Sequence, residues 1–263
     1  MLIVGERLNS TRSVVHKALI QRDEEYLIRE AEKQAQAGVD FIDLNTAALL
    51  DDEIPSLQWA IPLIQERITV PLSIDTPNPE AMEVGLRLHR GQALLNSITG
   101  ESKRINDLIP LIKKYRPRVI SLCLDDSGLP KSSDQALSTA EKMVIRLIDE
   151  GVDEEDIFID PLVQPISTDQ EAANLFLDSL RKIKSRFPKV KTIAGISNVS
   201  FGLPQRKLIN RTLLALALFS GLDAAILDPF DTQMKAAIHS TEALAGRDVY
   251  LKDYLAFIRS GLK

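Results

Sequence analysis

Five short apolar runs in this chain each end at a carboxylate or an amide. The polar endings are Asp43 with Asn45, Asp75, Asn96, Asp160, and Ser197 with Asn198. The runs have the length of buried strands. Polar side chains at the carboxyl ends of several strands are typical of a site at the top of a parallel β-barrel, because the strand ends converge there. The pattern therefore favours a barrel with a polar site at one end.

Strand-like and helix-like segments alternate along the whole sequence. The strands are predicted at roughly 2–5, 40–44, 70–75, 93–96, 118–123, 156–160, 191–196 and 223–227. Helical patterns lie at roughly 23–37, 56–68, 79–88, 101–115, 134–150, 168–187, 208–220 and 231–245, with an added helix at 250–259. This alternation implies right-handed βαβ crossovers and a parallel sheet. It predicts an α/β fold of the (β/α)8 TIM-barrel type, with a doubly wound open sheet as the alternative.

Length and composition narrow the class of protein. A chain of 263 residues suits one barrel domain spanning 1–263, and 44% hydrophobic with 26% charged residues predicts an ample core. The net charge of -5 and the absence of a basic cluster disfavour nucleic-acid binding. No 18-residue apolar span and no signal-peptide core are present, so we expect no membrane binding and a cytoplasmic location.

Metal and thiol chemistry find little support in the sequence. The one cysteine, Cys123, lies in an apolar run without a nearby base, which favours a packed core thiol over a nucleophile. The three histidines lack ligand spacing, so no metal site is predicted. Glycine-rich phosphate loops, a Gly-x-Ser-x-Gly elbow and a Cys-x-x-Cys motif are also absent. The remaining carboxylates and amides suit the binding of a planar nitrogen heterocycle and proton movement on it.

Three strand-end residues are candidates for binding the edge of such a ring. Asp75 can accept two parallel N–H bonds from an amino-pyrimidinone, or it caps the following helix. Asp160 offers a second carboxylate on backbone that Pro161 keeps extended, although Asp-Pro is also a common structural turn. Asn96 presents both a donor and an acceptor, or bonds only to backbone.

Further candidates come from the first, second and seventh strands. Asp43 and Asn45 face the same way, and we expect both at the rim because buried polar groups without partners are costly. Asn198 is a neutral hydrogen-bond donor for a reacting atom, or forms a simple Asx turn. Glu6 and Asn9 are expected to close the first strand, where they complete the ring of polar groups or pair with loop backbone.

Several motifs, in order and at matching spacing over nearly the whole chain, resemble those of the methyltetrahydrofolate:corrinoid protein methyltransferases. The motifs are MLIVGERLN at 1–9, DLN at 43–45, IDPL at 159–162, GISNVS at 195–200 and LINRT at 208–212. That family belongs to a wider pterin-binding barrel group, which includes dihydropteroate synthase and the folate module of cobalamin-dependent methionine synthase.

The resemblance implies a (β/α)8 barrel, commonly a homodimer, with a pterin cavity at its top. It implies methyl transfer between N5 of methyltetrahydrofolate and the cobalt of a cobalamin carried by a separate corrinoid protein, with no metal bound by this chain. It makes Asn198 the catalytic residue, through a hydrogen bond to N5. The expected pterin-binding set is Glu6, Asn9, Asp43, Asp75, Asn96, Asp160, Ser197 and Asn198.

Two departures bear on the choice within this group. Phe201 stands where the acetogenic enzymes have an amide near the methyl group. It favours a demethylation setting, in which the methyl moves from a small corrinoid protein onto tetrahydrofolate, over transfer to a corrinoid/iron–sulfur protein. A dihydropteroate synthase-like enzyme is disfavoured, because the loop at 9–12 reads NSTR and no pyrophosphate-binding cation set is apparent. A non-catalytic folate-binding barrel is the remaining alternative.

Overall fold

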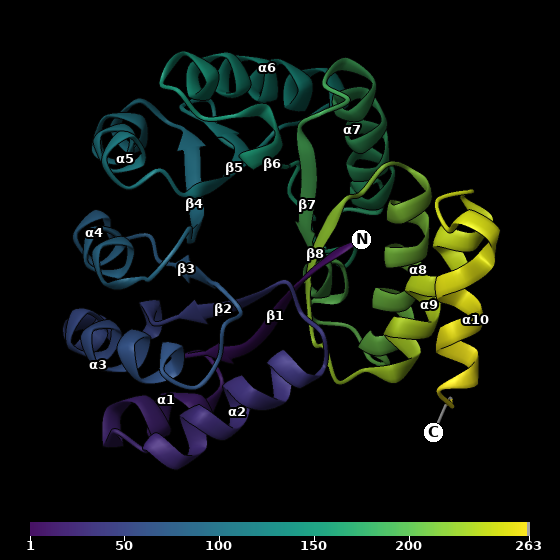
Figure 1. Ribbon diagram of the computed structural model, residues 1–263. Coiled ribbons are helices and arrows are strands. Elements are labelled where there is room, and N and C mark those ends of the chain that lie inside the picture. Colours follow the sequence, from purple (N-terminus) through teal and green to yellow (C-terminus); the bar gives the residue numbers. More distant parts are fainter. Residues whose placement is uncertain (262–263) are drawn as a thin grey trace.

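The computed structural model describes residues 1–261 and shows a closed barrel of parallel strands inside a ring of helices (Figure 1). Within these residues each strand pairs in parallel with the next, and the eighth pairs with the first through Leu2 to Gly5. The predicted TIM barrel is therefore confirmed, and the open sheet is excluded.

The elements alternate as the sequence pattern predicts. The strands are β1 Leu2–Asn9, β2 Phe41–Asn45, β3 Leu72–Asp75, β4 Leu94–Gly100, β5 Arg118–Asp125, β6 Ile157–Asp160, β7 Lys191–Gly195 and β8 Ala224–Leu227. The α-helices are α1 Ser13–Gln21, α2 Glu24–Gln36, α3 Glu53–Gln65, α4 Pro79–Leu88, α5 Ser102–Tyr115, α6 Ser133–Asp149, α7 Ala172–Arg186, α8 Arg206–Phe219, α9 Thr232–Leu244 and α10 Lys252–Arg259. Short 3-10 turns are η1 Ala47–Asp52, η2 Glu154–Asp156, η3 Ile196–Ser200 and η4 Val249–Leu251.

The start of the chain differs from the prediction in the extent of β1 and in an additional helix, α1. β1 runs on to Asn9, so Asn9 closes the strand as expected while Glu6 lies inside it. Helix α1 has no counterpart among the predicted helices. It has nine residues, no acidic residue in its first turn and no side-chain bond at its N-cap, so the usual signals of a helix start are missing.

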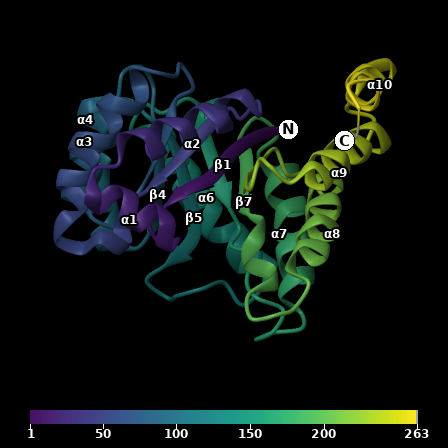
Figure 2. The ribbon, with the colours of Figure 1, turned by 90° about the horizontal axis from the view of Figure 1, so that it is seen from below.

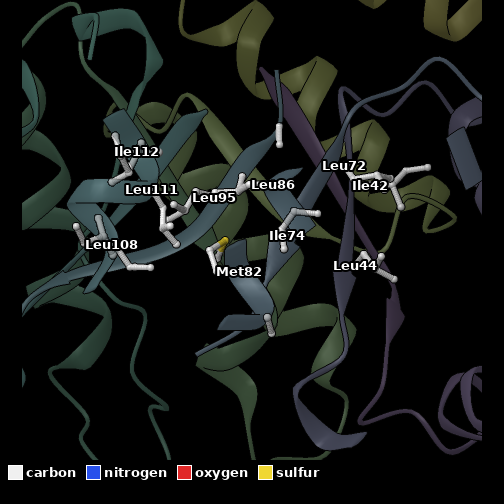
Figure 3. Close-up of a cluster of buried hydrophobic side chains, with 14 of the residues drawn as sticks. Ile42, Leu44, Leu72, Ile74, Met82, Leu86, Leu95, Leu108, Leu111 and Ile112 are labelled. Carbon is white, nitrogen blue, oxygen red and sulfur yellow. The ribbon is translucent and has the colours of Figure 1, made fainter. Parts of the chain in front are cut away.

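Two layers of apolar side chains hold the barrel together. The outer layer lies between strands and helices, and Figure 3 shows its part between β2, β3 and β4 and the helices α4 and α5. The inner layer fills the lower barrel with Val4, Phe41, Leu94, Ile120, Phe158, Ile193 and Ala224. We call this inner set the barrel plug. It closes the barrel interior beneath the carboxyl ends of the strands, so a ligand can enter only from above it.

Helix α10 lies apart from the ring. It contacts α9 and projects beside it, as the view in Figure 2 shows. His239 of α9 stacks on Phe257 of α10, with ring centroids 4.5 Å apart. The predicted added helix is thus confirmed, and it lies outside the repeating strand and helix units.

Candidate functional site

The polar site lies one layer above the barrel plug. Successive residues on a strand face opposite sides, so the residue two positions beyond a plug residue also faces inward. That position is Glu6 on β1, Asp43 on β2, Asn96 on β4 and Asp160 on β6. The alternation of the strands therefore places four of the predicted site residues in one inward-facing layer.

A hydrogen-bonded cluster occupies the arc of β2, β3 and β4. Asn96 Nδ2 and the Ser73 hydroxyl donate to Asp43 Oδ1 at 3.2 and 2.7 Å. Asn45 Nδ2 donates to Asp75 Oδ2 at 2.6 Å. The strand register places Asn45, Asp75 and Asn96 side by side. These contacts fix the orientation of the carboxylates before any ligand binds.

The cluster corrects one expectation and decides two alternatives. Asp43 does not lie at the rim; it is 2% exposed, and its two donors offset the cost of burying it. Asp75 is not the cap of the following helix, because Asn78 takes that role by accepting from the Glu80 N–H at 3.0 Å. Asn96 bonds to a side chain, so it is not an amide held only by backbone.

Asp160 is buried beyond this cluster, at the end of β6. Its Oδ1 accepts from the Leu162 backbone N–H at 2.8 Å, so the turn-forming alternative is also realised. Leu162 has a φ of 70°, a left-handed conformation that is strained for a leucine. The turn at 160–162 therefore holds the carboxyl firmly while the side chain still faces the barrel interior.

A cavity of about 490 Å³ occupies the opposite arc, formed by β7, β8 and β1. Glu6, Asn9, Ser197 and Asn198 line it. In a closed ring of eight strands β3 lies across from β7, so this cavity faces the hydrogen-bonded cluster across the barrel axis. The structure thus places the predicted site residues in two facing arcs, with Asp160 between the arcs on β6.

Asn198 lines the cavity from the 3-10 turn η3 after β7. Within residues 1–261 its side chain makes no hydrogen bond, so the Asx-turn alternative is not realised. Its amide nitrogen lies 3.3 Å from the point where a Cβ on Gly195 would stand. The glycine therefore gives the amide room, and its N–H groups remain available to a ligand.

Arg206 holds the loop that carries Asn198. Its Nη2 donates to the Ser197 carbonyl at 2.7 Å, and its Nε donates to the Ser200 hydroxyl at 3.0 Å. The loop η3 is therefore tied to the first residue of α8. Arg206 was not among the predicted site residues, and eight positions separate it from Asn198 with no motif to mark it.

Four other charged groups at the cavity were also missed. Arg12, Lys207, Asp228 and Asp231 line it together with Arg206. Segments distant in sequence thus bring three cations to one cavity, a grouping that the sequence did not indicate. Asp228 follows β8 directly, so the rule of polar residues after strand ends would have found it.

Burial makes the site carboxyls reluctant to ionise. It raises the pKa of Asp160 to about 7, and it raises the pKa of Asp43 and Asp75 above their ordinary value. The charge of Asp75 adds to the effect on Asp43. Burial also raises the pKa of Glu6 to about 7, with a second contribution from the charge of Asp228. Near neutral pH Asp160 and Glu6 can therefore give protons as well as accept hydrogen bonds.

Comparison with known proteins adds the family to this geometry. The family model described as pterin binding enzyme matches residues 5–228, most of the barrel. The chain belongs to the pterin-binding enzyme family. In this pterin-binding enzyme the matched range covers both arcs of the site, from Glu6 to Asp228.

Individual proteins resemble this pterin-binding enzyme in sequence or in fold. It is 33% identical to the methylcorrinoid:tetrahydrofolate methyltransferase of Eubacterium limosum, over 99% of this chain and 97% of the relative. It is 27% identical to methionine synthase of Mycobacterium tuberculosis, over 86% of this chain and 20% of that protein. Dihydropteroate synthase from Xanthomonas albilineans, in complex with 7,8-dihydropteroate, superposes with a TM-score of 0.74 at 17% identity, covering 92% of this chain and 93% of that one. This last likeness shows the fold alone.

The described residues contain neither a cluster suited to a metal ion nor a helix suited to cross a membrane. In residues 1–261 no group of three or more His, Cys, Asp or Glu side chains is arranged to hold a metal ion. No helix in that part of the chain has the length and apolar character needed to cross a membrane. Cys123 is buried, and burial raises the pKa of its thiol, as expected for a packed core cysteine.

Proposed function

We propose that this pterin-binding enzyme is a methyltransferase that moves a methyl group between N5 of methyltetrahydrofolate and the cobalt of a corrinoid protein. The observation that carries the proposal is the unengaged Asn198 amide in a cavity that faces a preformed carboxylate cluster. The near full-length relative, which is named for the same pair of substrates, supports it.

The hydrogen-bonded cluster, together with Asp160, binds the pterin ring. Asp75, Asn96 and Asp160 present fixed acceptors and a donor, which match the mixed N–H and C=O edge of an amino-pyrimidinone. A ring held by this edge extends across the barrel axis toward Asn198. The binding residues thereby convert an encounter between two molecules into a reaction at a fixed orientation.

Asn198 assists bond breaking at N5. Expelling N5 without help creates an amide anion, so a hydrogen bond to N5 gains strength as the carbon–nitrogen bond breaks. A contact that is stronger in the transition state than in the ground state accelerates the reaction. The nucleophile is the cob(I)amide of the partner protein, so this chain needs no nucleophilic side chain of its own.

The test follows the conversion of cob(I)alamin to methylcobalamin by absorbance, without oxygen, with methyltetrahydrofolate and catalytic amounts of protein. Asn198→Ala should lower the rate about 100-fold or more, with a much smaller loss of folate affinity. Asn174→Ala, a matched change at an exposed amide of α7, should leave both unchanged. Equal losses of rate and affinity in Asn198→Ala would contradict the role of Asn198. Folate binding without any methyl transfer would instead support the non-catalytic barrel.

We propose that the partner is a small corrinoid protein and that the methyl moves onto tetrahydrofolate. Phe201 supports this direction, because it replaces the amide of the acetogenic enzymes and is 66% exposed beside the Asn198 loop. The relative from Eubacterium limosum is named for this direction. Transfer rates should saturate with a small methylcorrinoid protein at lower concentration than with a corrinoid/iron–sulfur protein.

A homodimer is part of the same proposal. Large apolar side chains are exposed on α8, α9 and near α10, among them Phe219, Leu244 and Tyr250. Light scattering should give a mass near twice the 29.2 kDa of the chain. A mass of one chain across the micromolar range would refute the dimer.

One observation favours a second candidate, a dihydropteroate synthase-like reaction. Arg12, Arg206 and Lys207 line the cavity and can neutralise a pyrophosphate. In the methyltransferase these cations instead face the carboxylates of the glutamate tail of folate. Formation of dihydropteroate from a pterin pyrophosphate and p-aminobenzoate would favour the synthase, and its absence alongside methyl transfer would exclude it.

A further inference from the structure

Glu6 faces the cavity from the first strand, at a β-bulge that separates it from Leu8. The pairing of β1 with β2 shifts between Gly5 and Leu8, where three steps along β1 match two along β2. Strand alternation places Glu6 inward, two positions after Val4, and the bulge turns Leu8 outward into the layer between strands and helices. Arg7 points away from the cavity, toward α2, while Glu6 lines the cavity.

The bulge is locked from outside the barrel. At the bulge, the backbone N–H of Arg7 donates to a side chain, Gln34 Oε1, at 3.3 Å. A Cβ on Gly5 would lie 2.3 Å from the same Gln34 oxygen, so a side chain there would displace Gln34 from this hydrogen bond. The Arg7 guanidinium donates to Glu30 and, at 3.1 Å, to Asp228. Helix α2 and the end of β8 thus fix the backbone that carries Glu6.

The groups around Glu6 leave it balanced between its two protonation states. Asp228 after β8 favours the protonated form, while Arg12 after β1 and Arg206 of α8 favour the carboxylate, as does the adjacent Ser197 hydroxyl. Burial outweighs the two cations and raises the pKa of Glu6 to about 7. Such a group changes its protonation readily near neutral pH.

The other charges that line the cavity are Lys207 and Asp231. Asp231 is engaged elsewhere, because Arg211 donates to it at 2.7 Å and it caps helix α9. Asp228 pairs with Arg7. Glu6 is therefore the cavity carboxyl that no cation holds in a direct ion pair within residues 1–261.

We propose that Glu6 is the general acid and base that exchanges the proton of folate N5, while Asn198 holds the hydrogen bond there. The inference rests on the proposed function and adds to it the group that moves the proton. Glu6 shares the cavity with Asn198 and lies against Ser197, the residue before it. Asp43 and Asp75 lie outside this cavity in the facing arc, and Asp160 lies outside it at the end of β6.

The step balances in both directions. From methylfolate, the electron pair of Co(I) forms the bond to the methyl carbon, and cobalt becomes Co(III). The pair of the C–N5 bond stays on N5, which takes the proton of Glu6 and leaves a carboxylate. From the methylcorrinoid, N5 attacks the methyl carbon, the Co–C pair returns to cobalt as Co(I), and Glu6 accepts the proton that N5 releases.

The experiment measures single-turnover methyl transfer with free cobalamin, in both directions, from pH 5.5 to pH 8.5. In the wild-type protein, transfer from methylfolate should fall above about pH 7, and transfer onto tetrahydrofolate should fall below it. Glu6→Gln should lose about 100-fold or more in rate, and neither direction should retain the inflection. Folate affinity, measured by titration calorimetry, should change far less than the rate. Glu83→Gln, at a carboxyl on α4 outside the cavity, is the matched control.

Glu6→Asp keeps the proposal testable if the glutamine variant does not fold. The shorter carboxyl should retain a pH inflection at a shifted position, with a reduced rate in both directions. Wild-type profiles in Glu6→Gln, or an unshifted inflection and unchanged rate in Glu6→Asp, would overturn the role of Glu6 alone. Absence of methyl transfer by the wild-type protein in either direction would overturn the proposed function, and the role of Glu6 with it.

Discussion

The buried carboxyl of Asp160 gives a prediction that needs no substrate. Asp160 has no cationic partner within residues 1–261, and burial raises its pKa from an ordinary 3.8 to about 7. The folded state therefore holds a proton that the unfolded chain releases above pH 4. Asn cannot ionise and nearly matches the shape of Asp, so Asp160→Asn removes this difference between the two states.

The size of the effect follows from the shift. The folded protein binds more protons than the unfolded chain between about pH 4 and pH 7, so the wild-type free energy of unfolding falls as pH rises through that range. Each pKa unit corresponds to about 1.4 kcal/mol. Asp160→Asn should therefore be more stable than wild type by about 2 kcal/mol at pH 5 and about 4 kcal/mol at pH 8.

Urea unfolding at half-unit steps from pH 5 to pH 8 measures this difference. Asp51→Asn, at an exposed carboxyl, is the matched control and should stay within about 0.5 kcal/mol of wild type throughout. An Asp160→Asn advantage that does not grow with pH would refute the buried-proton explanation. A variant less stable than wild type at pH 8 would show that contacts in the folded protein stabilise the ionised Asp160 carboxylate.

Three further changes test the packing, a helix cap and the cavity rim. Gly85→Ala should destabilise by about 1–2 kcal/mol in urea unfolding, because the new Cβ would lie 2.7 Å from Ile74 Cγ2. Asp231→Ala removes both the cap of α9 and the Arg211 ion pair, and should lower the unfolding free energy by about 2–3 kcal/mol. Phe201→Gln should leave stability within about 0.5 kcal/mol, because the ring is exposed. In steady-state kinetics it should raise KM for the corrinoid protein and leave transfer to free cob(I)alamin unchanged.

Most helices and strands could be predicted because short stretches of sequence determine where they begin and end. Helix α4 illustrates this. Asn78 and Pro79 predict its start, and in the structure Asn78 is the N-cap and Pro79 is the first helical residue. The strands were found from apolar runs bounded by polar turns. Helix α1 escaped because neither its cap nor its first turn carries a side chain that favours a helix start.

Site residues could be predicted from the sequence only where the end of a single strand determines their position. Asp75, Asn96 and Asp160 follow from the strand ends, but the depth of Asp43 depends on donors from two neighbouring strands. The gathering of Arg12 and Arg206 depends on loops far apart in sequence that meet only in the closed barrel. No local pattern encodes such a meeting.

The two facing arcs of the barrel mouth come from different segments of the chain and have different proposed roles. One arc is built from the segment 41–100, and the other from the first strand with the segment 191–231. Under the proposed roles, evolutionary changes in the second segment can alter the reaction while the first segment continues to bind the pterin. A barrel organised in this way is a versatile starting point for new pterin chemistry, because a changed loop after β7 or β8 leaves the hydrogen bonds around Asp43 and Asp75 untouched.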